Sequence, residues 1–332
     1  MKEANVLSAD AVFEGGGVKG IGLVGAIAVA EERGYLWQNV AGTSAGAIVA
    51  TMVAAGYSAA EMKEIMNELD YNKFTDKGLL DRIPLVGKLA SVIFEKGIYE
   101  GKWFEDWISG LLQKKGVKTF GDLIQNESKN EPKYRFKLRV IASDISQGKL
   151  LVLPQDIADF GIRPEDLNVA AAIRMSMSIP FFYEPVKLRN MKTNELSYIV
   201  DGGMLSNFPV WLFDSEGEPE WPTFGFKLVE PEEGAPHTIR GPISMFTALF
   251  STMSGAHDAR YIKDTDFVRT IGIPTLDVKT TEFDLTKERS EALYQSGRQA
   301  AEKFFDSWNF DKYVKDYRKG QPRPHRGEGL RL

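Results

Sequence analysis

The chain has 332 residues, of which 43% are hydrophobic and 26% are charged. This length suffices for one large domain with a substantial core, or for two small ones. The formal net charge of -5 gives no indication of nucleic-acid binding, and the lack of cysteine excludes disulfides, thiolate metal sites and cysteine catalysis. No His/Cys/Asp cluster has metal-ligand spacing, so we expect neither a metal nor a cofactor.

Targeting signals are missing from the sequence. Residues 1–10 lack the basic and apolar pattern of a secretory signal, and no stretch approaches the roughly 20 apolar residues of a membrane span. We therefore expect a cytoplasmic protein, and peripheral contact with a membrane stays open.

A glycine-rich loop, Gly15-Gly16-Gly17-Val18-Lys19-Gly20, stands between a predicted strand over 9–13 and a predicted apolar helix over 21–33. Such a loop directs backbone N–H groups to one spot at a helix N-terminus and favours an anion. The glycines fit a dinucleotide fingerprint, but no acidic residue follows the second strand to hold a ribose. A P-loop would need a lysine where Ile21 stands. An oxyanion hole and a plain tight turn remain as interpretations.

The next motif, Gly42-Thr43-Ser44-Ala45-Gly46, reads G-x-S-x-G. A short strand over 38–41 is predicted before it and a helix over 45–55 after it. Strand, sharp turn and helix are the context of a nucleophile elbow, in which the serine hydroxyl stands at the helix N-terminus. The alternative is that small residues simply let the helix pack closely on the strand.

Further along, Ser58 and Glu61 form a capping box for a helix that reaches about residue 69. A strand over 198–200 runs into Asp201-Gly202-Gly203, which is either a turn signal or a site residue held near another backbone.

The other predicted elements are a short helix over 119–125, strands over 134–142, 149–153, 223–229 and 267–271, and helices over 166–177, 243–262 and 286–308.

The sequence has no internal repeat and no shift in composition that marks a domain boundary. We therefore predict one domain over 9–308, followed by a tail over 309–332. From Asp311 onward, this tail has seven basic residues and three acidic ones, and we expect its end from Gly320 to be mobile.

The segment over 79–112 combines apolar residues with scattered cations, and Trp103 and Trp107 share one face of a helix. Helices that cover a sheet are the favoured interpretation of this pattern. The alternative is a lid, an acyl-chain groove or a face that meets a lipid interface.

Four blocks and their order resemble the patatin-like phospholipase family. They are the loop over 15–20, the elbow over 42–46, the Ala-rich helix that leads into Ser176-Met177-Ser178-Ile179-Pro180, and the Asp201-Gly202-Gly203 turn. The resemblance covers residues 9–305, is weakest between 70 and 130, and does not reach the tail. It implies an α/β fold with three α/β/α layers around a mainly parallel central sheet. It also implies hydrolysis of a phospholipid or another acyl-ester lipid through an acyl-serine intermediate.

The resemblance also assigns roles to single residues. Ser44 is then the nucleophile and Asp201 the base of a Ser–Asp dyad. The loop from Gly15 to Gly20 forms the oxyanion hole, with the N–H groups of Gly16, Gly17 and Val18 as donors and that of Ala45 as a further candidate. Gly42, Gly46, Gly202 and Gly203 shape the two turns. Lys19 either orients the loop, meets a phosphate or is simply solvated.

Two alternatives remain open. An aspartate with an ordinary pKa near ~3.9 is a weak base unless burial raises that pKa. A Ser-His-Asp triad through His257 is therefore a rival, whereas His237 and His325 lie in a Pro-rich loop and in the tail. A non-catalytic lipid- or ligand-binding protein on the same fold is the second rival.

Overall fold

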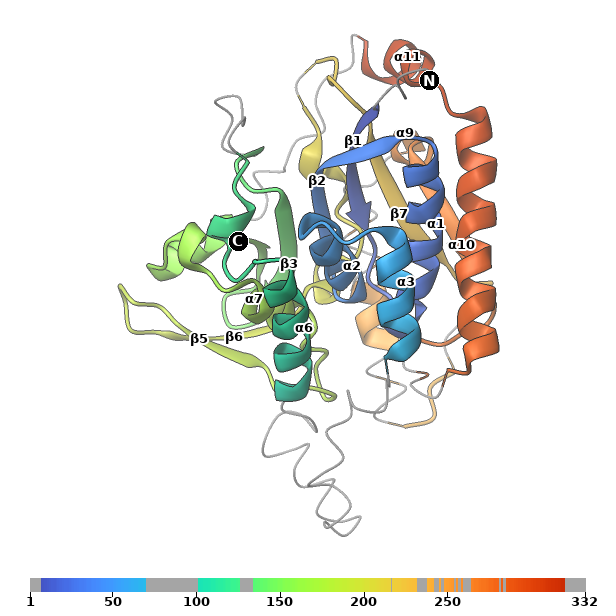
Figure 1. Ribbon diagram of the computed structural model, residues 1–332. Helices are drawn as coiled ribbons and strands as arrows, with labels where there is room; N and C mark the ends of the chain where they lie inside the picture. Colours follow the sequence, from blue (N-terminus) through green and yellow to red (C-terminus); the bar gives the residue numbers. More distant parts are fainter. Residues whose placement is uncertain are drawn as a thin grey trace.

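The computed structural model describes residues 7–69, 101–125, 134–215, 217–231 and 238–319, except 242–244, 246–247, 254, 256–257, 259–263, 281 and 283–284. Within these residues, one mixed sheet forms the centre of the molecule, in the order β5-β6-β3-β2-β1-β7-β8, with β4 paired to β3 (Figure 1). The strands are β1 (Leu7–Phe13), β2 (Tyr35–Thr43), β3 (Leu138–Asp144), β4 (Lys149–Leu153), β5 (Val186–Arg189), β6 (Leu196–Asp201), β7 (Thr223–Val229) and β8 (Thr270–Pro274).

The pairs β3–β2, β2–β1, β1–β7 and β7–β8 are parallel. The pairs β3–β4, β3–β6 and β5–β6 are antiparallel. Parallel strands connected through helices bury both faces of a sheet, which explains why several of these strands are buried almost throughout.

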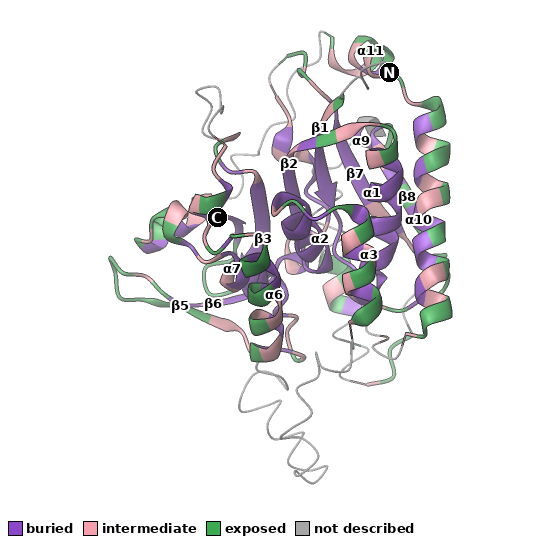
Figure 2. Cartoon of the chain, viewed as in Figure 1, coloured by how far each residue is buried: buried purple, intermediate pink, exposed green. Residues whose placement is uncertain are grey.

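Helices cover one face of the sheet, and their buried residues share a single apolar core with Ala9, Ala11 and Phe13 of β1. The α1 helix is buried between the sheet and α10, where a Cβ at Gly25 or Gly297 would collide with the facing backbone. Figure 2 shows the buried sheet and the alternating buried and exposed faces of α10. The helices are α1 (Gly20–Glu32), α2 (Ala45–Ala54), α3 (Ala59–Glu68), α6 (Lys102–Lys114), α7 (Val169–Ser176), α9 (Asp264–Phe267), α10 (Lys287–Ser307) and α11 (Phe310–Tyr313).

The opposite face of the sheet is covered by the segment that follows β6. Val12 and Ala41 pack against Phe213 of the short 3-10 helix η8 (Val210–Phe213), and Ile141 packs in a neighbouring cluster with Trp211. Layers on both faces confirm the predicted three-layer α/β/α fold with a mainly parallel central sheet.

Most of the predicted elements are confirmed, with shifted ends. The Ser58 capping box precedes α3, and β4 and β7 have the predicted bounds. The predicted strand at 267–271 is displaced, because Phe267 ends α9 and β8 begins at Thr270. The predicted helix at 119–125 is a 3-10 turn, η3 (Phe120–Leu123), and α7 starts only after its Asn168 cap.

Part of the predicted lid or interface segment lies in α6. Phe104 and Ile108 of this helix are buried, and the stacked indoles of Trp103 and Trp107 are partly buried against the main core. The described part of the segment therefore packs as cover for the core, while residues 79–100 lie outside the described residues. None of the helices in the described part of the chain combines the length and apolar content that crossing a bilayer would require.

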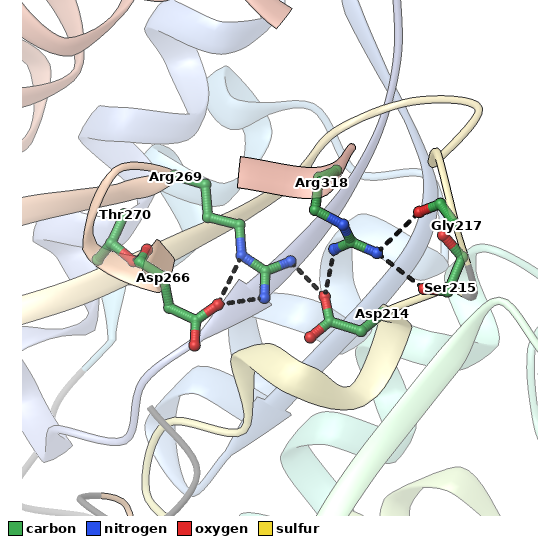
Figure 3. A network of polar contacts seen from close by, with 7 residues as sticks. All are labelled: Asp214, Ser215, Gly217, Asp266, Arg269, Thr270 and Arg318. Atoms are coloured by element: carbon green, nitrogen blue, oxygen red, sulfur yellow. Dashed lines mark hydrogen bonds and ion pairs between the residues drawn. The ribbon is translucent and has the colours of Figure 1, made fainter. Parts of the chain in front are cut away.

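The first part of the predicted tail is anchored to the domain by ion pairs (Figure 3). Arg269 is buried between Asp214 and Asp266, at 2.6 Å from each carboxylate. Arg318, beyond α11, reaches the same Asp214 at 3.4 Å and donates to the carbonyl oxygen of Ser215 at 2.8 Å. One buried carboxylate thus joins the body of the domain to its C-terminal segment.

These contacts predict unequal costs for two substitutions. Asp214→Ala leaves the buried Arg269 with one partner, and breaking a buried pair costs about 3–5 kcal/mol of the free energy of unfolding. Arg318→Ala keeps the Arg269–Asp214 pair, and we expect a smaller loss together with faster proteolysis near residues 310–319. Urea unfolding and limited proteolysis measure the two effects, and equal losses would contradict this account.

Candidate active site

Ser44 lies where β2 ends and α2 begins, in a backbone conformation with φ 52° and ψ -125°. A positive φ is strained for any residue other than glycine, and such strain is common where a side chain must be held for chemistry. Gly42 and Gly46 allow the turn, because a Cβ at either would collide with backbone of the elbow or of β1. The Ser44 N–H donates to Ser176 Oγ at 2.9 Å, and its hydroxyl donates to Met177 Sδ at 3.5 Å.

The register of β3 brings Asp201 beside the elbow. Ile141 of β3 pairs with Thr43, and the next residue, Ala142, pairs with Asp201. Because β4 occupies the other edge of β3, β2 and β6 share this edge one after the other. Gly202 fits the tight junction, since a Cβ there would collide with the Ile141 carbonyl and approach Thr43. An antiparallel strand thus delivers its last residue to the serine turn.

The Asp201 carboxyl group is buried, with 1% of the residue exposed. Its Oδ1 accepts the Gly203 N–H at 2.7 Å, whereas Oδ2 has no hydrogen bond of good geometry among the described residues. Burial raises the pKa of Asp201 to about 7, although interactions with the Ser44 side chain and the Gly203 N–H lower it. A carboxylate with this pKa can both accept and return a proton near neutral pH.

The glycine-rich loop lies directly against the elbow. A Cβ at Gly15 would lie 3.1 Å from the Ser44 Cβ. Four of the six loop N–H groups already have acceptors: Gly15 donates to Asn207 O, Val18 to Thr280 O, Lys19 to Gly16 O and Gly20 to Gly17 O. Within the described residues, the N–H groups of Gly16 and Gly17 have no such acceptor. These two, with that of Ala45, are the donors that the arrangement leaves for a ligand.

Lys19 is not a solvated side chain, because only 3% of it is exposed. Its ammonium group lies 2.6 Å from the Glu230 carboxylate, beyond the end of β7. This ion pair corrects the interpretation of Lys19 as a free surface cation and ties the loop to the neighbouring strand.

Sequence reasoning missed two residues that contact the site. Asn207 makes two hydrogen bonds with Gly15. Its main-chain oxygen accepts the Gly15 N–H at 3.3 Å, and its Nδ2 donates to the Gly15 oxygen at 3.1 Å. Ser176 accepts the Ser44 N–H at 2.9 Å. Both lie in or just after recognised blocks, but no local pattern marks either one. His237, His257 and His325 lie outside the described residues.

Comparison with known proteins decides the family. The model of the family described as patatin-like phospholipase matches residues 11–214, more than half of the chain. The chain belongs to the patatin-like phospholipase family. Membership in this family makes it a lipid acyl hydrolase, and it confirms the resemblance found in the four sequence blocks.

Three proteins illustrate the range of this similarity. The uncharacterized protein YqhO of Bacillus subtilis (strain 168) is 42% identical over 303 residues, which cover 91% of this chain and 99% of YqhO. The uncharacterized protein R571 of Acanthamoeba polyphaga mimivirus is 25% identical over 299 residues, 86% of this chain and 89% of R571. The structure of VipD from Legionella pneumophila has the same fold, with a TM-score of 0.54 and 20% identity over 91% of this chain and 67% of VipD.

The raised pKa of Asp201 predicts a stability gain in Asp201→Asn. The folded pKa lies above the ordinary value of 3.8, so the folded state binds the proton more tightly, and the free energy of unfolding falls as pH rises from about 4 to about 7. The amide does not ionise, and its oxygen can still accept from Gly203. At pH 8 we expect the variant to be more stable than the wild type by up to about 4 kcal/mol, at 1.36 kcal/mol per pKa unit.

Urea unfolding at pH 4 and pH 8 measures this difference. The gain should shrink toward pH 4, where the wild-type carboxyl group is protonated in the folded state and partly protonated in the unfolded state. A variant that is destabilised equally at both pH values would contradict the role of burial.

Proposed function

We propose that Ser44 and Asp201 form a catalytic dyad that hydrolyses acyl esters of lipids through an acyl-Ser44 intermediate. The observation that carries the proposal is the pairing of a strained serine with a buried carboxylate whose pKa is about 7. Family membership supports a phospholipid or another acyl-ester lipid as the substrate.

Acylation begins when Ser44 Oγ attacks the carbonyl carbon of the ester and its proton passes to Asp201. The carbonyl oxygen becomes negative, and the N–H groups of Gly16, Gly17 and Ala45 would stabilise it, aided by the N-terminus of α2. Collapse of the tetrahedral intermediate breaks the ester bond, and Asp201 returns the proton to the departing alkoxide oxygen.

Deacylation repeats these steps with water. The oxygen of a water molecule attacks the acyl carbon while Asp201 takes a proton from that water. Asp201 then returns the proton to Ser44 Oγ as the fatty acid leaves. Bond making and proton transfer balance without another group, so the dyad is sufficient for the reaction. Oδ2 of Asp201 is the oxygen available for the proton, because Oδ1 is occupied by Gly203.

Ser44→Ala should abolish ester hydrolysis and covalent labelling by a fluorophosphonate probe. The methyl group fits the same space, so we expect the variant to fold and to unfold cooperatively. Mass spectrometry of the labelled wild-type peptide identifies the modified residue. Hydrolysis at the wild-type rate by Ser44→Ala would contradict the assignment of the nucleophile, and a folded wild type that is never labelled would favour a non-catalytic binding protein.

Asp201→Asn should lower kcat by about 10²–10⁴, the range for a lost general base. His237→Ala and His257→Ala serve as controls and should retain most of the activity. A large loss in folded His257→Ala would replace the dyad by a Ser-His-Asp triad, in which Asp201→Asn is costly as well.

A further inference from the structure

Another buried carboxylate, Asp258, hydrogen-bonds residues 206–208 and has no part in the proton transfers above. It belongs to a partly described helical segment in which residues 248–253 and Asp258 are helical, and only 8% of it is exposed. Both of its oxygens are used. Oδ1 accepts the Ser206 hydroxyl at 2.8 Å, and Oδ2 accepts the N–H groups of Asn207 and Phe208, each at 3.0 Å.

The three residues that Asp258 holds lie at the junction between the dyad and the loop. They follow the Asp201-Gly202-Gly203 turn, and the Ser206 carbonyl oxygen accepts the Thr43 hydroxyl at 3.1 Å, one residue before Ser44. Asn207 contacts Gly15 through both its main chain and its side chain, at 3.3 Å and 3.1 Å. A displacement of this short segment would therefore move the Gly15 peptide, which immediately precedes the N–H groups of Gly16 and Gly17, the two loop donors without an acceptor among the described residues.

We propose that Asp258 is a positioning residue for the oxyanion loop. It fixes residues 206–208, and through Asn207 it sets the place of the Gly15 peptide relative to Ser44. The inference rests on the proposed function, because it assigns Asp258 to the same acyl-transfer site.

The charge of Asp258 suits this role. Burial raises its pKa to about 6, but the bonds from Ser206, Asn207 and Phe208, and the charge of Lys227, favour the ionised form. An ionised carboxylate accepts hydrogen bonds from all three donors. An amide at this position has an NH₂ group in place of one oxygen, and this group faces a donor and cannot accept from it. Asp258→Asn therefore keeps the size of the side chain and removes part of its acceptor capacity.

The chain offers a matched control. Asp122 also accepts two backbone N–H groups and a hydroxyl, from Lys118 at 2.9 Å and from Thr119 at 2.8 Å and 3.4 Å. These bonds stay within the exposed capping box of η3. All three bonds reach one oxygen, Oδ2, so Asp122→Asn removes the charge of a carboxylate with similar donors at a place away from Ser44. It separates the loss of such a charge in general from loss of loop position.

The test measures the second-order rate of fluorophosphonate labelling at Ser44, with kcat and KM for a soluble short-chain ester. Asp258→Asn should slow labelling and lower kcat by on the order of 10- to 100-fold, because small misplacements of a site are this costly, and KM should change little. Asp122→Asn should label at the wild-type rate. Asn207→Ala should slow labelling similarly, and adding Asp258→Asn to it should have little further effect.

Each outcome bears on the proposal. Labelling of folded Asp258→Asn at the wild-type rate would overturn the positioning role alone. If Asp258→Asn does not fold, Asn207→Ala carries the test, and an unchanged labelling rate in that variant would overturn the link to Gly15. A wild-type chain that is not labelled at Ser44 would overturn the proposed function, and this inference with it.

Discussion

Burial of the Asp201 carboxyl group is the constraint on which the rest of the site depends. A buried carboxylate loses its hydration, and here one oxygen has a single N–H donor while the other has no good hydrogen bond among the described residues. The pKa therefore rises to about 7, and the group becomes a usable base without a histidine. The same burial costs folding free energy, so reactivity and stability oppose each other at this residue.

Two chain segments have to meet closely for this burial to serve a reaction. Thr43 and Asp201 pair with successive residues on one edge of β3. The backbones of the two turns that follow are therefore close to neighbouring strands, and some positions in them have no room for a side chain. Gly46 and Gly202 meet that requirement, because a Cβ at either position would collide with backbone of a neighbouring strand. The strained φ of Ser44 is tolerated because the elements on either side hold it in place: α2 and residues 39–43 at the end of β2 are buried.

Local patterns predicted the elements of the site, but contacts between distant segments completed it. The glycine spacing around Ser44 and the Asp201-Gly202-Gly203 turn are short-range signals of close backbone approach, so both residues could be found from the sequence. The bond from Val18 to Thr280 and the ion pair of Lys19 with Glu230 join residues more than 200 positions apart. No periodicity encodes such pairs, and the antiparallel direction of β6 likewise depends on tertiary pairing rather than on its own residues.

The most direct measurement is the pH dependence of kcat/KM for a soluble ester in a chain in which His237, His257 and His325 are all replaced by Gln. The profile of kcat/KM reports ionisations of the free enzyme. If the buried Asp201 is the base, this histidine-free chain stays active, and its kcat/KM falls as pH drops through about 7. Loss of activity in the folded histidine-free chain, or a kcat/KM that stays constant down to pH 5, would contradict the account.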